Sequence, residues 1–298
     1  MGGVFPLCVV IPNWNLPAET IECVASVLAA AGNDDVSVVV VDNGSTDGSP
    51  EALASAFGEL VAQVQMGWNR GFAGAVNAGV LYALEQGAAS VLVLNNDTVI
   101  DQEMLAILNR VAKEHPDAGI LAPAIYRVDA PTRLWRLGDR HHRWLPMPRR
   151  IPDHEVAAEV VEADYVTGCG MLIRREVIEA IGLFDERFFM YYEDADFCKR
   201  ARARGFRILC VPAAKMWHRV SATARRDMAT NLYWRARGQV LFYRKHVGCD
   251  ISWLPHFFVA GKVMLMALRY SLQGRWTCSR SVIQGALDGY RISLRQEG

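Results

Sequence analysis

The stretch VSVVVVDNGSTDGS, at residues 36–49, decides the fold, because a continuous apolar run passes directly into a small polar cluster. Such a run predicts a strand that is buried on both faces, as in a parallel sheet. The same pattern occurs at residues 7–15 (LCVVIPNWN) and 90–97 (SVLVLNND). Helical patterns follow the three runs, at Leu16–Ala31, Ser49–Phe57 and Asp101–Glu114. This alternation predicts an α/β domain with a mostly parallel sheet flanked by helices.

The rest of the chain continues this pattern and then changes character. We expect a weaker strand, a helix and a further strand at Val61–Gln65, Ala73–Gln86 and Gly119–Ile125. Residues 126–160 are rich in Pro, Arg and Trp and predict a long, mobile surface excursion. Helices and a strand are then expected at Arg174–Ile181, Asp194–Arg204 and Arg207–Val211. Because the chain looks helical after about residue 222, we predict a domain at residues 1–222 and a helical C-terminal region at residues 223–298.

Length and composition limit the class of protein. With 298 residues, 51% of them apolar, the chain is long enough for a large core, which excludes wholesale disorder and a small disulfide scaffold. The seven cysteines are odd in number and never spaced C-x-x-C, so we expect reduced, mostly buried thiols in a cytoplasmic protein. The first residues have no charged segment and run straight into a strand pattern, so no signal peptide is expected.

The zero net charge conceals an uneven distribution. Residues 1–198 contain 13 Lys and Arg against 28 Asp and Glu, whereas residues 199–298 contain 19 against 4. The overall balance argues against a nucleic-acid partner. The basic last third suits an anionic surface or a phosphate-bearing ligand, although the two parts could also simply neutralise each other in the fold.

Polar clusters that include Asn13, Asp42, Asn69 and Asp97 follow the expected strands. Ligands of parallel sheets bind beyond the carboxyl ends of the strands. Any one cluster could be only a cap or a turn, but four at one edge predict a binding site. No Walker A motif or G-x-G-x-x-G fingerprint is present, which argues against a P-loop NTPase and a Rossmann dehydrogenase. An Asp at a strand end can accept from a nucleobase or a ribose hydroxyl, and Asp97 could bind a divalent cation that neutralises a diphosphate.

Two longer segments carry a resemblance to a known family. The first is VVIPNWN…VVVVDNGSTDGS…NRGFAGAVNAG…VLVLNNDT, within residues 9–98. The second, at residues 168–218, is GCGMLIRREVIEAIGLFDERFFMYYEDADFCKRARARGFRILCVPAAKMWH. Together they resemble the inverting GT-A glycosyltransferases of family 2, in particular the bacterial rhamnosyltransferase-like branch that builds cell-surface glycans. The resemblance extends over about residues 5–223 and implies the GT-A fold, followed here by a helical C-terminal extension.

The resemblance also implies roles for individual residues. Asp194 of the Glu193-Asp194 pair would be the catalytic base, with Glu193 as an orienting or acceptor-binding partner. Asp97, at the end of the DxD position, would bind Mg²⁺ or Mn²⁺, and His218 would join the metal shell. The nucleotide-sugar site would be formed by Pro12, Asn13, Asn15, Asp42, Asn69, Gly71, Phe72, Asn77, Asn95 and Asn96.

Two features of these motifs affect the expected chemistry. The first DxD position is Asn95 rather than Asp, and an amide brings no charge. We therefore expect weak metal binding until the diphosphate of the donor arrives, which suits Mg²⁺. Asp194 falls in the first turn of an expected helix, where the helix dipole favours an ionised carboxylate. Taken without the resemblance, this acidic cluster is more typical of a helix cap, and Asp196 could be one.

The expected reaction is transfer of a sugar, with inversion, from a nucleoside diphosphate to a hydroxyl of a glycan or lipid-linked precursor. The resemblance suggests dTDP-rhamnose as the first donor to consider. A UDP-hexose donor is the nearest alternative, and a catalytically silent sugar-nucleotide-binding subunit is a second. A nucleotidyltransferase ranks lower, because the start of the chain has no G-x-G-x-R-x-x-P-x-x-K-type phosphate loop.

Residues 251–272 are strongly apolar but interrupted by Pro255, Lys262 and Arg269. The charge-free part is too short to span a bilayer, which needs roughly 20 residues. We expect an interfacial helix in peripheral contact with a membrane or a homo-oligomer contact. The alternative is a helix packed on the core of the protein itself.

Overall fold

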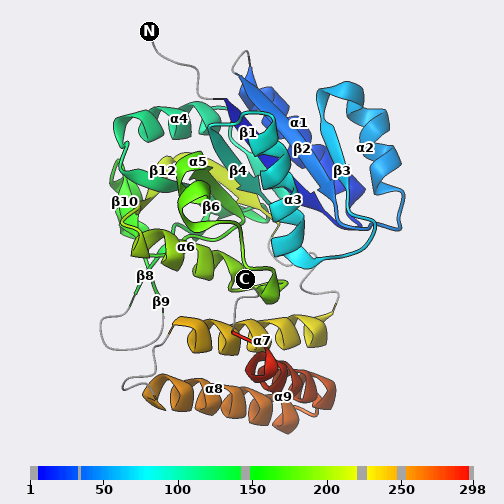
Figure 1. Ribbon diagram of the computed structural model, residues 1–298, viewed down its shortest axis with the longest axis vertical. Helices are drawn as coiled ribbons and strands as arrows, with labels where there is room; N and C mark the ends of the chain where they lie inside the picture. The colour runs from blue at the N-terminus through cyan, green and yellow to red at the C-terminus, as the bar shows by residue number, and fades with distance from the viewer. Residues whose placement is uncertain (1–5, 33–34, 142–147, 220–226, 247–252, 295–298) are drawn as a thin grey trace. The chain divides into compact units, whose positions relative to one another are not determined.

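The computed structural model describes residues 6–32, 35–141, 148–219, 227–246 and 253–294 (Figure 1). The chain divides into two compact units. The first unit consists of Met1–Phe184 and Phe197–Val220, and the second consists of Asp185–Asp196 and Ser221–Gly298. The division falls inside helix α6 (Glu193–Ala203), whose first turn belongs to the second unit.

The first unit is built on a ten-stranded mixed sheet. Its strands form the path β10-β12-β6-β11-β4-β1-β2-β3, with β5 paired to β12 and β7 paired to β6. The strands are β1 (Leu7–Asn13), β2 (Val36–Asp42), β3 (Ala62–Gln65), β4 (Ser90–Leu94), β5 (Thr98–Ile100), β6 (Ala118–Arg127), β7 (Ala130–Arg136), β10 (Val161–Ala163), β11 (Gly170–Arg174) and β12 (Arg207–His218).

The N-terminal half of this sheet is parallel, as its continuous apolar runs predict. Strands β4, β1, β2 and β3 run parallel, whereas β11 lies antiparallel between β4 and β6. Beyond β11, strands β6 and β12 are again parallel to each other. The carboxyl ends of β1, β2 and β4 therefore meet at one edge, where the polar clusters of the sequence begin.

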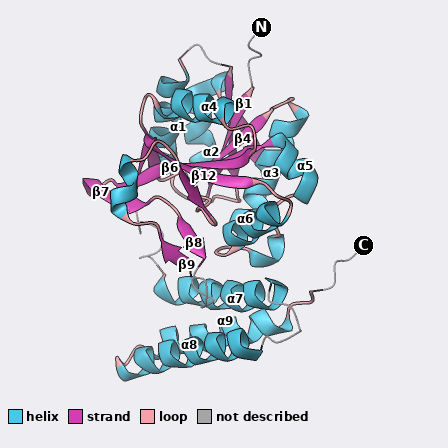
Figure 2. Ribbon diagram, turned by 90° about the vertical axis from the view of Figure 1, so that its left-hand side faces the viewer, coloured by secondary structure: helices cyan, strands magenta, loops and turns pink. Residues whose placement is uncertain are grey.

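Helices cover both faces of the sheet (Figures 1 and 2). Alternate residues of β1 separate the two cores, since Cys8 and Val10 pack on one side and Val9 and Ile11 on the other. One face is covered by α3 (Gly71–Glu85), α5 (Arg175–Ile181) and the part of α6 from Phe197 onward. The other face is covered by α1 (Pro17–Ala31), α2 (Ser49–Phe57) and α4 (Met104–Glu114). Burial on both faces explains why these strands contain so few polar residues.

The expectation of a mobile excursion at residues 126–160 is wrong for the described part of that segment. It contains β7, the end of β6, a small sheet of β8 (Asp139–His141) and β9 (Pro148–Arg150), and a short 3₁₀ helix at Asp153–Ala157. Leu134, Leu137 and Ile151 enter the core. Four of the arginines that suggested a solvent-exposed loop form ion pairs, such as Arg140 with Glu155 at 2.7 Å.

The second unit is helical. Its helices are α7 (Met228–His246), α8 (Trp253–Leu272) and α9 (Trp276–Arg291), preceded in the chain by the turn at residues 185–192. Gly285 and Gly289 let α9 approach α7 closely, because a Cβ at either position would come within 2.2 and 2.6 Å of α7 backbone oxygens. In the described parts of the chain, none of the helices is both long and apolar enough to cross a membrane.

Candidate functional site

The ends of β1 and β2 form the centre of a polar rim in the first unit. Asn13 and Asp42 are register partners in these parallel strands, and both side chains are buried. Asn13 Nδ2 donates to Asp42 Oδ1 at 3.1 Å and to Ser45 Oγ at 3.2 Å. The Ser45 backbone N–H donates to Asp42 Oδ2 at 3.0 Å. Both carboxylate oxygens of Asp42 are thus held in place, and each retains acceptor capacity for a ligand.

Asn96, which follows β4, joins the same rim. Its Nδ2 donates to Asn13 Oδ1 at 3.2 Å and to Thr20 Oγ1 at 2.9 Å. The Thr20 hydroxyl, on α1, donates to Asn13 Oδ1 at 2.7 Å. The polar clusters after β1, β2 and β4 therefore converge, as predicted. Thr20 was missed because it lies within a helix, and nothing in its sequence context indicates that it faces the strand ends.

The cluster after β3 closes against Asn43. Asn43 Nδ2 donates to Asn69 Oδ1 at 3.1 Å and to the Gly71 carbonyl at 3.0 Å, and Asn43 Oδ1 accepts from the Arg70 backbone N–H at 2.8 Å. Gly44 allows this closure, since a Cβ there would lie 2.6 Å from the Trp68 backbone. Sequence reasoning did not select Asn43, although its place directly after Asp42 could have indicated it.

The other residues predicted to contact the nucleotide fall into three groups by their contacts and burial. Asn15 accepts from the Thr46 backbone N–H at 2.8 Å, which ties the loops after β1 and β2 together. Pro12 and Phe72 are partly buried. Asn77 is buried, and its amide donates to the Phe184 carbonyl and accepts from the Phe184 N–H, each at 2.9 Å. Asn77 therefore anchors α3 to residue 184, and its expected contact with the nucleotide stays a prediction.

Asp97 and His218 form the charged part of the rim. Strand β12 pairs with β5, which places His218 opposite Thr98, and His218 Nε2 lies 3.1 Å from Asp97 Oδ1. Both residues are buried. Burial lowers the pKa of His218, but Cys169 and the Asp97 carboxylate outweigh burial and raise the pKa to about 10. The pair therefore joins two predicted residues that are 121 positions apart in the sequence.

The donor atoms near Asp97 fit a divalent cation that is completed by its substrate. In the described residues, no group of three or more His, Cys, Asp and Glu side chains is placed to hold a metal ion by itself. Asp97 offers a carboxylate, His218 offers an imidazole once a cation displaces its proton, and the buried Asn95 Oδ1 has no hydrogen-bond partner. Mg²⁺ commonly takes one or two carboxylates together with substrate phosphates and waters, and Mn²⁺ accepts the same oxygen-rich set.

Glu193 and Asp194 lie in the second unit, at the start of α6 after an unusual turn. Phe189, Tyr191 and Tyr192 have positive φ values of 56°, 67° and 74°, a conformation that costs a non-glycine residue about 1–3 kcal/mol. Such a turn persists only where its surroundings fix it. It fixes the orientation of the first turn of α6, in which Glu193 and Asp194 are both buried.

Buried ion pairs hold this turn to α7. Asp196 is 0% exposed, and its Oδ1 lies 2.7 Å from Lys245 Nζ and 2.6 Å from His246 Nε2. Lys245 also lies 2.7 Å from Asp185 Oδ2, and Arg187 binds the same carboxylate at 2.7 Å. The alternative that Asp196 is only a helix cap is therefore wrong, because its carboxylate is one half of a buried charge pair.

Glu193 differs from these paired acids. Burial, together with the negative charges of Asp194 and Asp196, raises the pKa of Glu193 well above its ordinary value. The buried Glu193 Oε2 has no hydrogen-bond partner. A carboxyl group in this position favours its neutral, hydrogen-bond-donating form, which suits an orienting role better than that of a base.

The chain is similar to known glycosyltransferases in sequence and in fold. The sequence model described as "Glycosyl transferase family 2" matches residues 8–182. An N-acetylglucosaminyl-diphospho-decaprenol L-rhamnosyltransferase of Mycobacterium tuberculosis is 27% identical over 249 residues, which cover 72% of this chain and 77% of that protein. The dTDP-rhamnosyl transferase RfbF of Shigella flexneri is 25% identical over 217 residues, covering 70% of this chain and 71% of RfbF.

Solved structures share the fold. The mannosyltransferase PcManGT of Pyrobaculum calidifontis, in complex with GDP-Man and Mn²⁺, has a TM-score of 0.59 at 18% identity and covers 96% of this chain and 87% of its own. GalNAc-T7 with UDP, GalNAc and Mn²⁺ has a TM-score of 0.57 at 16% identity, covering 91% of this chain and 58% of its own. At these identities the likeness concerns the arrangement of the backbone.

Proposed function

The chain belongs to glycosyl transferase family 2, as a rhamnosyltransferase-like enzyme with the GT-A fold. We propose that it transfers a sugar, first of all L-rhamnose from dTDP-rhamnose, to a hydroxyl of a cell-surface glycan or lipid-linked precursor. Transfer proceeds with inversion and requires Mg²⁺ or Mn²⁺. The observation that carries this proposal is the rim in which the hydrogen-bonded pair Asn13–Asp42 accompanies the pair Asp97–His218.

The rim binds the nucleoside diphosphate of the donor. Asp42, held by Asn13 and Ser45, accepts from the nucleobase imide or from a ribose hydroxyl. Asn43 and Asn69 hold the loop that closes over the nucleotide. Asp97, His218 after loss of its proton and the Asn95 amide oxygen would hold the divalent cation, which would stabilise the negative charge that develops on the departing diphosphate.

The acidic turn of the second unit supplies the base. The acceptor oxygen bonds to the anomeric carbon while the bond from that carbon to the diphosphate oxygen breaks. Asp194 takes the hydroxyl proton as this happens, a contribution of on the order of 10²–10⁴-fold to the rate. Glu193, kept neutral by burial, donates a hydrogen bond that orients the acceptor.

The donor sugar is proposed from the relatives rather than from the rim. Support for rhamnose comes from the Mycobacterium and Shigella relatives, whose names specify rhamnosyl transfer. A relative of Haloferax volcanii that is 32% identical over 177 residues, 57% of this chain and 54% of that protein, is named a hexosyltransferase. A hexose donor is therefore the second candidate within the same chemistry.

One experiment tests the proposal in two steps. A thermal-shift screen of dTDP-rhamnose, UDP-glucose and UDP-galactose, each with Mg²⁺, Mn²⁺ or EDTA, identifies the donor, because a ligand of the native state raises the apparent melting temperature. We expect the largest shift with dTDP-rhamnose and metal. NMR of the glycoside formed on a synthetic acceptor should then show the anomeric configuration opposite to that of the donor. Retained configuration, or donor binding without any transfer, would contradict the enzyme proposal.

A further inference from the structure

Helix α8 of the second unit has two apolar faces. One packs inside the unit, through Val259, Val263 and Ala267. The other faces outward, and its members are between 55% and 80% exposed: Phe257, Met264, Leu265, Leu268 and Leu272. The outward face of a helix on a water-soluble protein is normally polar. Here the polar residues Lys262 and Arg269, seven positions apart, form only one edge of it.

Helix α9 repeats this arrangement. Trp276, Ile283, Leu287 and Tyr290 recur at helical spacing, and each is between 43% and 69% exposed. Arg280 and Arg291 are exposed on the same helix. The opposite side of α9, with Gly285 and Gly289, packs closely against α7. Each helix therefore presents an apolar stripe with basic residues beside it.

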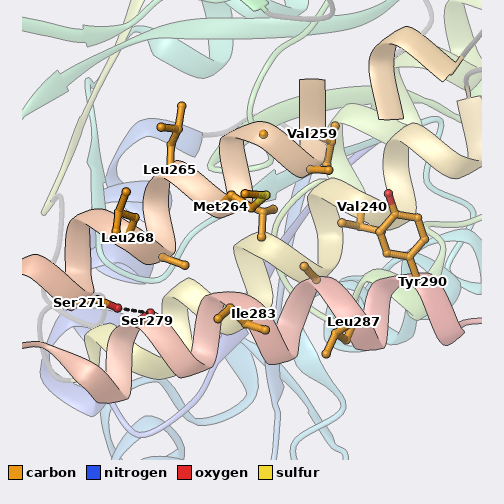
Figure 3. A pocket seen from close by; sticks show the side chains of 15 residues that line it. Val240, Val259, Met264, Leu265, Leu268, Ser271, Ser279, Ile283, Leu287 and Tyr290 are labelled. Atoms are coloured by element: carbon orange, nitrogen blue, oxygen red, sulfur yellow. Dashed lines mark hydrogen bonds between the residues drawn. The ribbon is translucent and has the colours of Figure 1, made fainter. Parts of the chain in front are cut away.

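The two stripes border one hollow. A cavity of about 760 Å³ is lined from α8 by Met264, Leu265 and Leu268 and from α9 by Ile283, Leu287 and Tyr290 (Figure 3). At one end, the Ser271 hydroxyl donates a hydrogen bond to Ser279 Oγ at 2.9 Å, so these two hydroxyls are partners of each other (Figure 3). We call the cavity and the exposed stripes around it the apolar groove. A contiguous apolar surface of this kind marks a site of interaction.

The charges around the apolar groove have one predominant sign. The described residues 253–294 contain five Lys and Arg against one acid, Asp288. Asp288 already accepts hydrogen bonds from Tyr233 at 3.0 Å and Arg291 at 3.1 Å. The complementary partner is therefore an apolar surface that carries negative charge at its border.

We propose that the apolar groove docks the protein on a bilayer that contains anionic lipids. The leucines, Met264 and Phe257 enter the boundary between headgroups and acyl chains, and Lys262, Arg269 and Arg280 bind lipid phosphates. Trp276 and Tyr290 suit the interface, because an aromatic ring with a polar tip prefers that depth. A second copy of the chain fits less well, since a twofold contact through this face would bring the basic borders of both copies together.

Vesicle co-sedimentation of the full-length protein, without donor or acceptor, tests this docking. We expect binding to vesicles of equal parts phosphatidylglycerol and phosphatidylcholine, weakened by added salt, and little binding to phosphatidylcholine alone. Leu265→Ser with Leu268→Ser should weaken binding about tenfold for each leucine. Leu60→Ser, at a leucine 74% exposed in the first unit, is the matched control and should leave binding unchanged.

Charge variants give an independent readout. Lys262→Gln with Arg269→Gln should weaken binding about thirtyfold, whereas Arg133→Gln with Arg204→Gln, at exposed sites of the first unit, should not. Failure to bind anionic vesicles, or binding that the leucine and charge pairs leave unchanged, would overturn the docking surface. If the protein does not bind vesicles but forms a dimer in sedimentation equilibrium, and Leu265→Ser with Leu268→Ser dissociates that dimer, the apolar groove would be assigned to a second copy of the chain. None of these outcomes depends on the transfer reaction, which is measured separately with a water-soluble acceptor.

Discussion

The polar rim of the first unit and the acidic turn of the second are held in place by different forces. At the rim, Asn13, Asp42 and Asn43 are fixed by hydrogen bonds of amides, a hydroxyl and backbone N–H groups. In the turn, Asp185 and Asp196 are fixed by buried ion pairs with cations of α7 and the turn. The rim thus has little positive charge of its own at Asp42, whereas the turn contains its own countercharges.

This difference suits different tasks. Because neutral groups hold Asp42 and the charge of His218 is paired with Asp97, the charge of a diphosphate is left to be balanced by a cation that arrives with it. A turn that carries a catalytic carboxylate must keep that carboxylate in one place while charge moves, and paired neighbours supply this rigidity. The cost is that removing one partner leaves a buried charge uncompensated, which is far more damaging than the loss of one neutral hydrogen bond.

The largest expected effect separates the two acids at the start of α6. Asp194→Asn should lower kcat on the order of 10²–10⁴-fold while leaving the donor Kd unchanged, because a neutral amide cannot accept the proton. Glu193→Gln is the matched control and should lower kcat by about tenfold at most, since its carboxyl group already favours the neutral form. Steady-state kinetics and donor titration measure both values. Equal losses in the two variants would contradict the assignment of the base.

The next effect tests whether the turn depends on its cations. Lys245→Met removes the ammonium that bridges Asp185 and Asp196 and should lower the free energy of unfolding by about 3–5 kcal/mol. Arg110→Met breaks the exposed pair with Glu114 and should leave the free energy of unfolding nearly unchanged, because solvent screens an exposed pair. Urea unfolding measures both. A loss for Lys245→Met no greater than the control would show that the buried pairs do not hold the turn.

At the rim, a substitution should lower transfer activity through loss of the bound cation rather than through loss of a contact between side chains. Asp97→Ala should reduce transfer about a hundredfold and abolish its response to Mg²⁺ and Mn²⁺, because the carboxylate is the charged ligand offered there. Asp117→Asn, at an exposed acid of the same unit, is the control and should behave like the unchanged protein. An unaltered metal titration in Asp97→Ala would refute the cation site.

The same contrast explains how far the sequence could predict the molecule. Asn13, Asp42 and Asn96 could be brought together from the sequence, because parallel strands align their carboxyl ends and the polar clusters sit at those ends. The partner of Asp196 could not, since Lys245 lies on a helix about fifty residues later and no local pattern connects them. Without the family motifs, His218 is equally remote, because its position depends on the pairing of β12 with β5.

The strands at residues 130–150 show a related limit. Their sequence is rich in Pro and Arg, which are typical of loops, and one of the acids that pair with the arginines lies outside this segment, Glu155 for Arg140. Propensity describes an isolated segment, and tertiary pairing overrides it. Asn77 illustrates the same point at a single residue, because only the fold shows that its amide binds the backbone of Phe184.

The smallest predicted effect concerns acid stability of the turn. Burial raises the pKa of Asp185, but Arg187 and Lys245 outweigh it, so the pKa in the folded protein lies well below its ordinary value. A depressed folded pKa contributes stability that is present above the unfolded pKa of about 3.9 and is lost as the pH falls below it. Asp185→Asn should therefore remove on the order of 2 kcal/mol at pH 7 and flatten the loss of unfolding free energy below about pH 4. Equal acid slopes in the unchanged protein and in Asp185→Asn would show that the turn is not stabilised by this charge.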